Sequence, residues 1–267
     1  MKHGSTTQQL DLGAHSIAFV DEGRGLPVLC LHSLAGSLRM WDGAAAELVR
    51  QYRVLRCDAR GHGASTGTMP YTVEGLARDA LALLDAQGIT RCAVLGLSMG
   101  GQAAMHLALA APHRIAAVVL ANTSAGALPD AKRRVAQTKA RIDEIGYECF
   151  ASEYVASRLA DGSASSAYAD YLRDALALGA QRYVATLYSI LTQDLTAELS
   201  RLHVPALLVS GTADISTTPE RMRALGALLP TCRTLELEGA GHFSCLDQPE
   251  QFIAGVVEFL AFNIKDS

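Results

Sequence analysis

The chain has 267 residues, of which 49% are hydrophobic and 19% are charged, with a formal net charge of -4 at pH 7. This length and composition suit one α/β domain with an insertion and a large core. Because the net charge is negative, the sequence lacks the excess of positive charge that is typical of nucleic-acid-binding proteins. No apolar run is long enough to span a membrane. We therefore expect a small-molecule substrate rather than a nucleic-acid or membrane partner, and the sequence leaves the oligomeric state open.

The N-terminus and the cysteines bear on the cellular compartment. Residues 1–5 are followed by polar residues without an apolar segment, so no secretory signal is expected. The six cysteines are scattered singly and form no Cys-x-x-Cys pair, which favours reduced thiols over disulfides or a metal site. The sequence therefore predicts a cytoplasmic protein that needs no metal or other cofactor.

Strands and helices alternate in the first half of the chain. Strands are predicted from residue 16 and at 27–31, 52–57, 92–97 and 115–120, and helices at 41–50, 73–87 and 102–111. The strand segments are apolar runs or alternate between apolar and polar residues, and the segment 73–87 carries an apolar stripe that Gly88 ends as a C-cap. This alternation is typical of a parallel sheet covered by helices.

Two loops directly follow predicted strands, so they lie at the carboxyl edge of the sheet, where ligands bind in open α/β folds. In the first loop, the backbone N–H of Leu34 is a candidate donor to a reacting oxygen, and Ser33 beside it is a candidate substrate contact. His32 is expected to brace this loop rather than to act as a base. In the second loop, Asp58 and His62 flank a glycine-containing turn and are expected to hold it through hydrogen bonds to the backbone.

The sequence Gly-Leu-Ser-Met-Gly follows the apolar run 92–97 and leads into an Ala-rich helix. A serine on such a sharp strand-to-helix turn is strained, and Gly96 and Gly100 leave room for the backbone around it. We therefore interpret Ser98 as a nucleophile. Because the first N–H groups of a helix have no partner within the helix, the N–H of Met99 is a second candidate donor to a reacting oxygen.

The alternation stops between residues 124 and 200, where polar segments with helical periodicity follow one another without a convincing strand. We interpret this region as a helical cap, so that residues 1–123 and 201–267 form the core. Strands are predicted again at 204–211 and 233–237, and helices at 219–228 and 249–262. Asp214 falls in the loop after the first of these strands, and His242 falls in the loop after the second.

A serine hydroxyl needs an imidazole to take its proton and a carboxylate to orient that imidazole. Ser98, Asp214 and His242 occur in the chain order of the α/β-hydrolase fold rather than in that of the chymotrypsin-like or subtilisin-like proteases. The other acidic residues are poorer candidates for the role of Asp214. The preceding strand ends in Asn122 and Thr123, and the acidic residues that flank the histidine loop would serve only if that loop folded back.

The chain resembles the α/β-hydrolases over nearly its whole length, and in particular the 3-oxoadipate enol-lactone hydrolases. The segments that carry the resemblance are Ser33-Leu34 with Met40-Trp41-Asp42, residues 53–63, residues 96–101 and residues 120–123. The resemblance implies a mostly parallel central sheet flanked by helices with an inserted cap. It also implies that Ser98, Asp214 and His242 form a catalytic triad that opens an unsaturated lactone bearing a free carboxylate.

Other activities share these core motifs. Esterases, C–C bond hydrolases and cofactor-free perhydrolases remain alternatives, and so does a ligand receptor that keeps the triad but turns over slowly. The complete triad together with both candidate N–H donors favours an enzyme over a receptor. A dehalogenase or an epoxide hydrolase is disfavoured because the nucleophile position holds serine.

Basic residues cluster at the start of the predicted cap. They are Lys132, Arg133, Arg134, Lys139 and Arg141. One interpretation is a helix that exposes these charges to solvent. The other is that Arg133 or Arg134 binds a substrate carboxylate, since a guanidinium can hold a carboxylate through two parallel hydrogen bonds.

Overall fold

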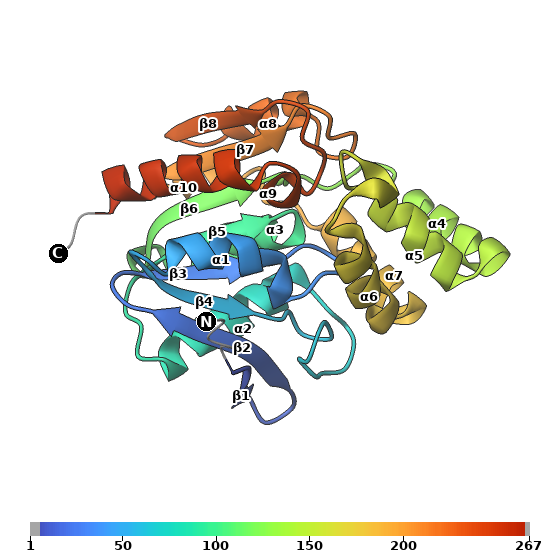
Figure 1. Cartoon of the computed structure of the whole chain (residues 1–267), viewed down its shortest axis with the longest axis horizontal. Coiled ribbons are helices and arrows are strands. Elements are labelled where there is room, and N and C mark those ends of the chain that lie inside the picture. The colour runs from blue at the N-terminus through green and yellow to red at the C-terminus, as the bar shows by residue number, and fades with distance from the viewer. Residues whose placement is uncertain (1–5, 265–267) are drawn as a thin grey trace.

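The structure, a computed structural model, describes residues 6–264 (Figure 1). Residues 1–5, on which the prediction about a secretory signal rests, lie outside this range. Among the described residues, none of the helices has both the length and the apolar character needed to cross a lipid bilayer.

An eight-stranded sheet with the order β1-β2-β4-β3-β5-β6-β7-β8 runs through the described residues. The strands are β1 (Gln8–Asp11), β2 (Ser16–Gly23), β3 (Pro27–Leu31), β4 (Arg53–Cys57), β5 (Cys92–Leu97), β6 (Ile115–Ala121), β7 (Ala206–Gly211) and β8 (Cys232–Leu237). The pairings β1–β2 and β2–β4 are antiparallel, and all the others are parallel. The predicted fold class, an α/β-hydrolase fold with a mostly parallel sheet, is therefore confirmed.

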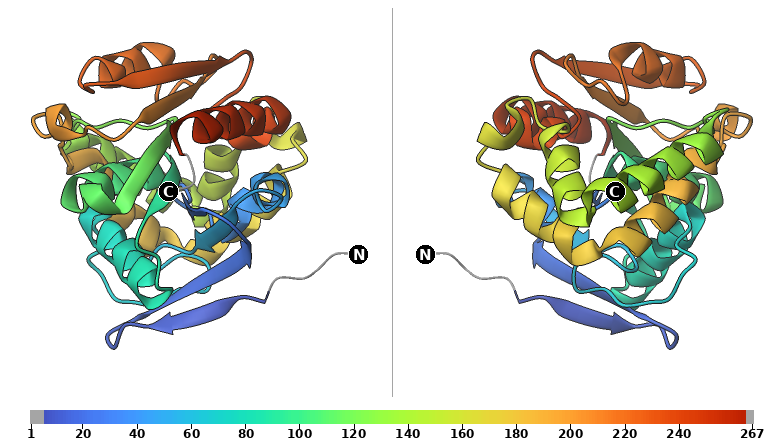
Figure 2. Two further views of the ribbon diagram at one scale, coloured as in Figure 1. Left: turned by 90° about the vertical axis from the view of Figure 1, so that its left-hand side faces the viewer. Right: turned by 90° about the vertical axis from the view of Figure 1, so that its right-hand side faces the viewer.

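Helices cover both faces of this sheet, which explains why every residue of β5 and β6 is buried and apolar. The flanking helices are α1 (Asp42–Leu48), α2 (Val73–Ala86), α3 (Met99–Ala110), α8 (Pro219–Gly226), α9 (Ser244–Asp247) and α10 (Pro249–Asn263). Figure 2 shows α1 and α10 on one face and α2 and α3 on the other. Short 3-10 turns lie at Leu38–Trp41, Pro112–Arg114, Gly162–Ala164 and Leu199–Arg201.

Residues 124–200 connect β6 to β7, and the structure gives them helices and turns but no strand. The helices are α4 (Ala131–Ile145), α5 (Tyr147–Ala156), α6 (Tyr168–Leu178) and α7 (Ala180–Thr192). They group together beyond the carboxyl ends of the parallel strands (Figure 1). We call residues 124–200 the helical segment.

The predicted elements differ from the structure mainly at their ends. The third helix begins at Met99 rather than at residue 102, so it starts directly after Ser98. Strand β7 begins at Ala206, because Pro205 has no N–H for the sheet ladder. Strand β1 was not predicted from the sequence, because it is a short edge strand whose residues are polar except for Leu10.

Candidate active site

Ser98 lies on the turn between β5 and α3 with φ of 53° and ψ of -112°, which is an unfavourable backbone conformation for a residue with a side chain. Two hydrogen bonds hold it there: its N–H donates to the Ala121 carbonyl at 2.9 Å, and the Thr123 hydroxyl donates to its carbonyl at 2.7 Å. A Cβ at Gly96 would lie 2.3 Å from the Gly100 carbonyl oxygen, so the tight turn requires glycine there.

Asp214 and His242 come together from the loops after β7 and β8. Nδ1 of His242 lies 2.8 Å from Oδ2 of Asp214, and both residues are buried. When Nδ1 donates to the carboxylate, Nε2 remains free to accept a proton. The predicted acid and histidine therefore form a hydrogen-bonded pair.

The environment of Asp214 favours its ionised form. Burial raises the pKa of this carboxyl, but hydrogen bonds from His242, Thr217 and Asn122 and the coulombic attraction of His242 outweigh burial and hold the pKa well below its usual range. The backbone N–H groups of Ser216 and Thr217 also donate to Oδ1, at 2.7 and 3.1 Å. Asp214 is thus a negative partner fixed in position for the imidazole.

Asn122 supports this acid, a role that could not be predicted from its place after the preceding strand. Its Nδ2 donates to Asp214 at 2.9 Å and to the Gly241 carbonyl at 3.3 Å. Its Oδ1 accepts a hydrogen bond from Ser244 at 2.5 Å. The only signal in the sequence is a polar side chain directly after a buried strand.

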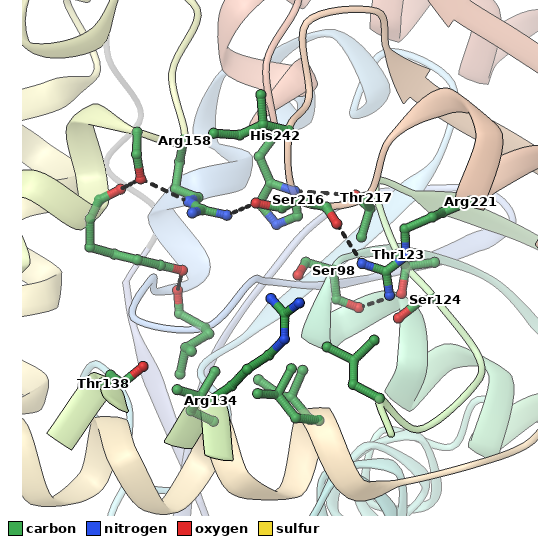
Figure 3. Close-up of a pocket in the computed structure, with 18 of the residues that line it drawn as sticks. Ser98, Thr123, Ser124, Arg134, Thr138, Arg158, Ser216, Thr217, Arg221 and His242 are labelled. Atoms are coloured by element: carbon green, nitrogen blue, oxygen red, sulfur yellow. Dashed lines mark hydrogen bonds between the residues drawn. The ribbon is translucent and has the colours of Figure 1, made fainter. Parts of the chain in front are cut away.

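Ser98 and His242 both line a cavity of about 780 Å³ (Figure 3). Leu34 and Thr123 contribute to its wall from the core. Most of the apolar wall comes from the helical segment, which contributes Leu128, Phe150, Tyr154, Tyr183, Leu187, Ile190 and Leu191. A volume of this size suits a small organic substrate.

The N–H groups of Leu34 and Met99, the two predicted oxygen-binding donors, lie on the loop after β3 and at the start of α3. Within residues 6–264 neither N–H donates a hydrogen bond to another protein group. The Leu34 carbonyl, in contrast, accepts hydrogen bonds from Tyr171 at 2.7 Å and from Tyr154 at 3.3 Å. Burial raises the pKa of both tyrosines, so their hydroxyl groups stay protonated donors.

A further contact joins the same loop to the helical segment. Asp174 on α6 accepts hydrogen bonds from Ser37 at 2.5 Å and from Arg39 at 3.1 Å. The roles of Tyr154, Tyr171 and Asp174 could not be predicted from the sequence, because no local pattern relates α5 and α6 to a loop more than a hundred residues earlier in the chain.

The structure places two of the predicted substrate contacts outside the cavity lining. Ser33 is fully buried beside Tyr171 and does not line the cavity, because its side chain packs into the protein. Arg133 is 70% exposed, pairs with Asp130 at 2.7 Å and also lies outside the cavity lining. Arg134, one residue further along α4, does reach into the cavity (Figure 3).

His32 has the bracing role that we predicted. Its Nδ1 donates to the Ser33 carbonyl at 2.7 Å, and its Nε2 accepts from the Ala59 N–H at 2.9 Å. Asp58 also acts as predicted, since its carboxylate accepts hydrogen bonds from the N–H groups of Leu38 and Ala64, at 2.6 and 2.8 Å. Burial, and then the nearby His32, lowers the pKa of His62 to about 3.

Because His62 is buried, we expect the free energy of unfolding to depend on pH. In the unfolded chain the pKa of this histidine is near 6.5. Below that pH the imidazole binds a proton in the unfolded state but not in the folded state, which favours unfolding. Its contribution to stability is complete above pH 6.5 and is lost as the pH falls towards 3. When the pH falls from 7 to 5, the free energy of unfolding of His62→Asn should therefore decrease by about 2 kcal/mol less than that of the unmodified protein. Urea titration at the two pH values measures this difference.

The matched control is His113→Asn, at an exposed histidine. This variant should lose as much stability between the two pH values as the unmodified protein. An unchanged pH dependence in His62→Asn would contradict a neutral, buried His62.

Comparison with known proteins places this geometry in context. A family profile described as the alpha/beta hydrolase fold matches residues 27–249. 3-Oxoadipate enol-lactonase 2 of Acinetobacter baylyi is 32% identical over 225 residues, covering 83% of this chain and 83% of that protein. The putative carbamate hydrolase RutD of Pseudomonas syringae pv. syringae is 31% identical over 250 residues, covering 88% and 94%. The crystal structure of the enol-lactonase from Burkholderia xenovorans LB400 superposes with a TM-score of 0.87 at 28% identity, covering 95% of this chain and 100% of that one.

Proposed function

The chain belongs to the α/β-hydrolase family, and from this premise we propose that it is a serine hydrolase that cleaves a small ester or lactone through an acyl-enzyme. The observation that carries the proposal is the arrangement of Ser98 on its strained turn and of the hydrogen-bonded Asp214 and His242 around one cavity. The similarity to two enol-lactonases favours lactones within this class.

In the proposed mechanism, the Ser98 hydroxyl attacks the substrate carbonyl carbon while Nε2 of His242 takes its proton. The tetrahedral intermediate collapses to an acyl-enzyme as the imidazolium returns the proton to the leaving oxygen. In a lactone this oxygen stays attached to the acyl group. Water then attacks the acyl carbon with His242 as the base, which releases a carboxylic acid and restores Ser98. Asp214, whose low pKa keeps it ionised, stabilises the imidazolium.

The oxyanion of the tetrahedral intermediate needs donors that are in place before the reaction. We propose that the N–H groups of Leu34 and Met99 fill this role. Their lack of a protein acceptor within the described residues supports the assignment, and so does the position of Met99 at the first turn of α3, where the helix dipole favours negative charge.

We also propose that the helical segment acts as a cap that shapes the substrate cavity, since Phe150, Tyr154 and Tyr183 line it from α5 and α7. Arg134 remains the proposed carboxylate contact of the basic cluster. Its contribution should be modest, because its side chain is 56% exposed and its guanidinium already pairs with Asp130 at 2.9 Å.

An aryl phosphonate ester tests the reaction and the oxyanion site together. We expect the protein to turn over a neutral aryl ester steadily and to be inactivated by the phosphonate with one adduct, on the Ser98 peptide in a mass spectrum. In a crystal structure of the adduct, a phosphonyl oxygen should lie within about 3.5 Å of the N–H groups of Leu34 and Met99. Labelling of another residue would contradict the nucleophile, and an oxygen far from both N–H groups would contradict the oxyanion site.

A further inference from the structure

The loop after β3 contains a tight turn. The N–H of Gly36 donates to the Ser33 carbonyl at 3.1 Å, which closes the turn around Leu34 and Ala35. Ala35 has a φ of 65°, whereas the φ of Leu34 is not positive. A positive φ at the second central residue alone defines a type II turn, and glycine or asparagine normally occupies that position. Because alanine occupies it in this protein, the turn is strained.

The strained residue lies with two others at the candidate active site. Among the described residues that carry a side chain, φ is positive only at Ala35, Ser98 and Asn122. Ser98 is the proposed nucleophile, and Asn122 donates a hydrogen bond to Asp214. Sparsely populated backbone conformations cluster at functional sites, where the surrounding structure holds them in place. The conformation of Ala35, directly after the proposed oxyanion donor Leu34, therefore calls for a group that holds it.

Tyr171 on α6 is that group. Its hydroxyl donates to the Leu34 carbonyl at 2.7 Å, and this carbonyl belongs to the peptide between the two central residues of the turn. Tyr154 on α5 donates to the same oxygen at 3.3 Å. The Tyr171 side chain also packs on Gly36, where a Cβ would lie 2.9 Å from the hydroxyl oxygen. The two hydroxyl groups thus fix the direction of the Leu34 carbonyl.

A type I turn is the alternative conformation for residues 33–36. It closes with the same hydrogen bond, and the φ of its second central residue is about -90°, which alanine adopts without strain. The two turn types differ by a rotation of the central peptide, which turns its carbonyl to the opposite side. A type I turn would therefore relieve Ala35, but the Leu34 carbonyl would lose its hydrogen bonds to both tyrosines.

We propose that Tyr171 is a positioning residue that holds residues 33–36 in the type II turn and thereby keeps the Leu34 N–H directed at the oxyanion. This inference rests on the proposed hydrolase function and deepens it. Rotation of the central peptide changes ψ of Leu34, the residue that carries the proposed donor, so a released turn disturbs the donor itself. Because Tyr171 is buried and lies outside the cavity lining, it acts through the residues that it holds rather than by touching the substrate.

Tyr171 also has a packing role, which has to be separated from its hydrogen bond. The centroid of its ring lies 4.3 Å from that of Phe243, the residue after His242. Tyr171→Phe keeps this ring contact and removes only the hydroxyl group. This variant therefore tests the hydrogen bond to Leu34 without emptying the space beside His242.

Steady-state hydrolysis of a neutral aryl ester, para-nitrophenyl acetate, measures the effect. We expect Tyr171→Phe to lower kcat by about 5- to 20-fold with little change in KM, because the loss falls on the transition state. Removal of a whole oxyanion donor costs more, about 10²- to 10³-fold. The matched control is Tyr147→Phe, which should keep the kcat of the unmodified protein. The Tyr147 hydroxyl donates to the Ala175 carbonyl at 2.7 Å within the helical segment, and Tyr147 lies outside the cavity lining.

A second substitution, Ala35→Gly, distinguishes the proposed role from a purely structural one. Glycine adopts a positive φ without strain, so the turn no longer needs the tyrosine hydroxyl to stay in the type II form. When both proteins carry Ala35→Gly, we therefore expect the loss caused by Tyr171→Phe to shrink to less than about threefold. An equal loss in the two backgrounds would overturn the inference, because the hydroxyl would then act in another way.

Crystal structures of the variants give a readout that does not need turnover. Tyr171→Phe should contain a conformer with a negative φ at Ala35 and a rotated Leu34 carbonyl, whereas Tyr147→Phe should keep the type II turn. Full kcat or an unchanged turn in Tyr171→Phe would overturn the inference and leave the hydrolase function standing. If the unmodified protein hydrolysed no ester but the turn still rotated in Tyr171→Phe, the hydrolase function would be overturned, whereas Tyr171 would still hold the turn.

Discussion

Replacing Ser98 by alanine, or His242 by alanine, should lower kcat for a neutral aryl ester by at least about 10³-fold. In the proposed mechanism, each change removes one of two groups that act together: the hydroxyl that attacks the substrate, or the imidazole that takes the proton of that hydroxyl. Since Asp214 and Asn122 keep their own hydrogen bonds in Ser98→Ala, this variant should fold normally. Its thermal unfolding should match that of the unmodified protein.

The measurement is steady-state hydrolysis by variants purified free of unmodified enzyme, with the His113→Asn protein as an active control. Asp214→Asn should also be severely impaired, because an amide neither stabilises the imidazolium nor selects the correct tautomer of His242. Residual activity above about a tenth in Ser98→Ala or His242→Ala would show that the catalytic assignment is wrong.

Gly100→Ala should lower the free energy of unfolding by about 3 kcal/mol or more, or prevent folding altogether. A Cβ at this position would lie 2.0 Å from the Leu31 carbonyl oxygen, which belongs to the backbone of β3 in the middle of the sheet. Neither α3 nor β3 can move away without breaking contacts on its other side. Urea titration measures the loss directly.

Gly43→Ala provides the control for this substitution. Gly43 is exposed in α1, and a Cβ there would meet no atom within 4 Å. Alanine should therefore raise the free energy of unfolding by about 0.5–1 kcal/mol through its higher helix propensity. A loss below about 1 kcal/mol in Gly100→Ala would contradict the close packing of α3 against β3.

The sequence predicted the sheet well where burial is complete. Strands β5 and β6 are continuous apolar runs between turn residues. This pattern is typical of parallel strands that are buried on both faces. The predicted nucleophile Ser98 directly follows β5, and the predicted acid Asp214 lies in the loop after the buried β7. The predicted base His242 lies in the loop after β8, an edge strand that is mostly not buried, so its place in the chain order identified it rather than burial. Strand β1 was missed because its position at the edge of the sheet leaves most of its residues exposed and polar.

The cavity wall could not be predicted as well, because it depends on how the helical segment packs. The basic cluster on α4 could be recognised in the sequence, but which of its neighbouring arginines faces inward depends on the rotation of that helix. Arg133 therefore lies outside the cavity lining, whereas Arg134 belongs to it. Arg158 and Arg221, which also line the cavity, are far apart in the sequence, and they meet at Ser216 only through tertiary structure.

The hydrogen bonds from Tyr171 and Tyr154 to the Leu34 carbonyl bear on how this protein can be re-engineered. Exchanging the helical segment for another one would replace both tyrosines, together with Asp174, which accepts hydrogen bonds from Ser37 and Arg39. Unless the new segment supplies equivalent groups, the chimera would keep Ser98, but the loop after β3 would lose these hydrogen bonds. A helical segment chosen to change the substrate range should therefore be exchanged together with the loop after β3, because the two are joined by hydrogen bonds.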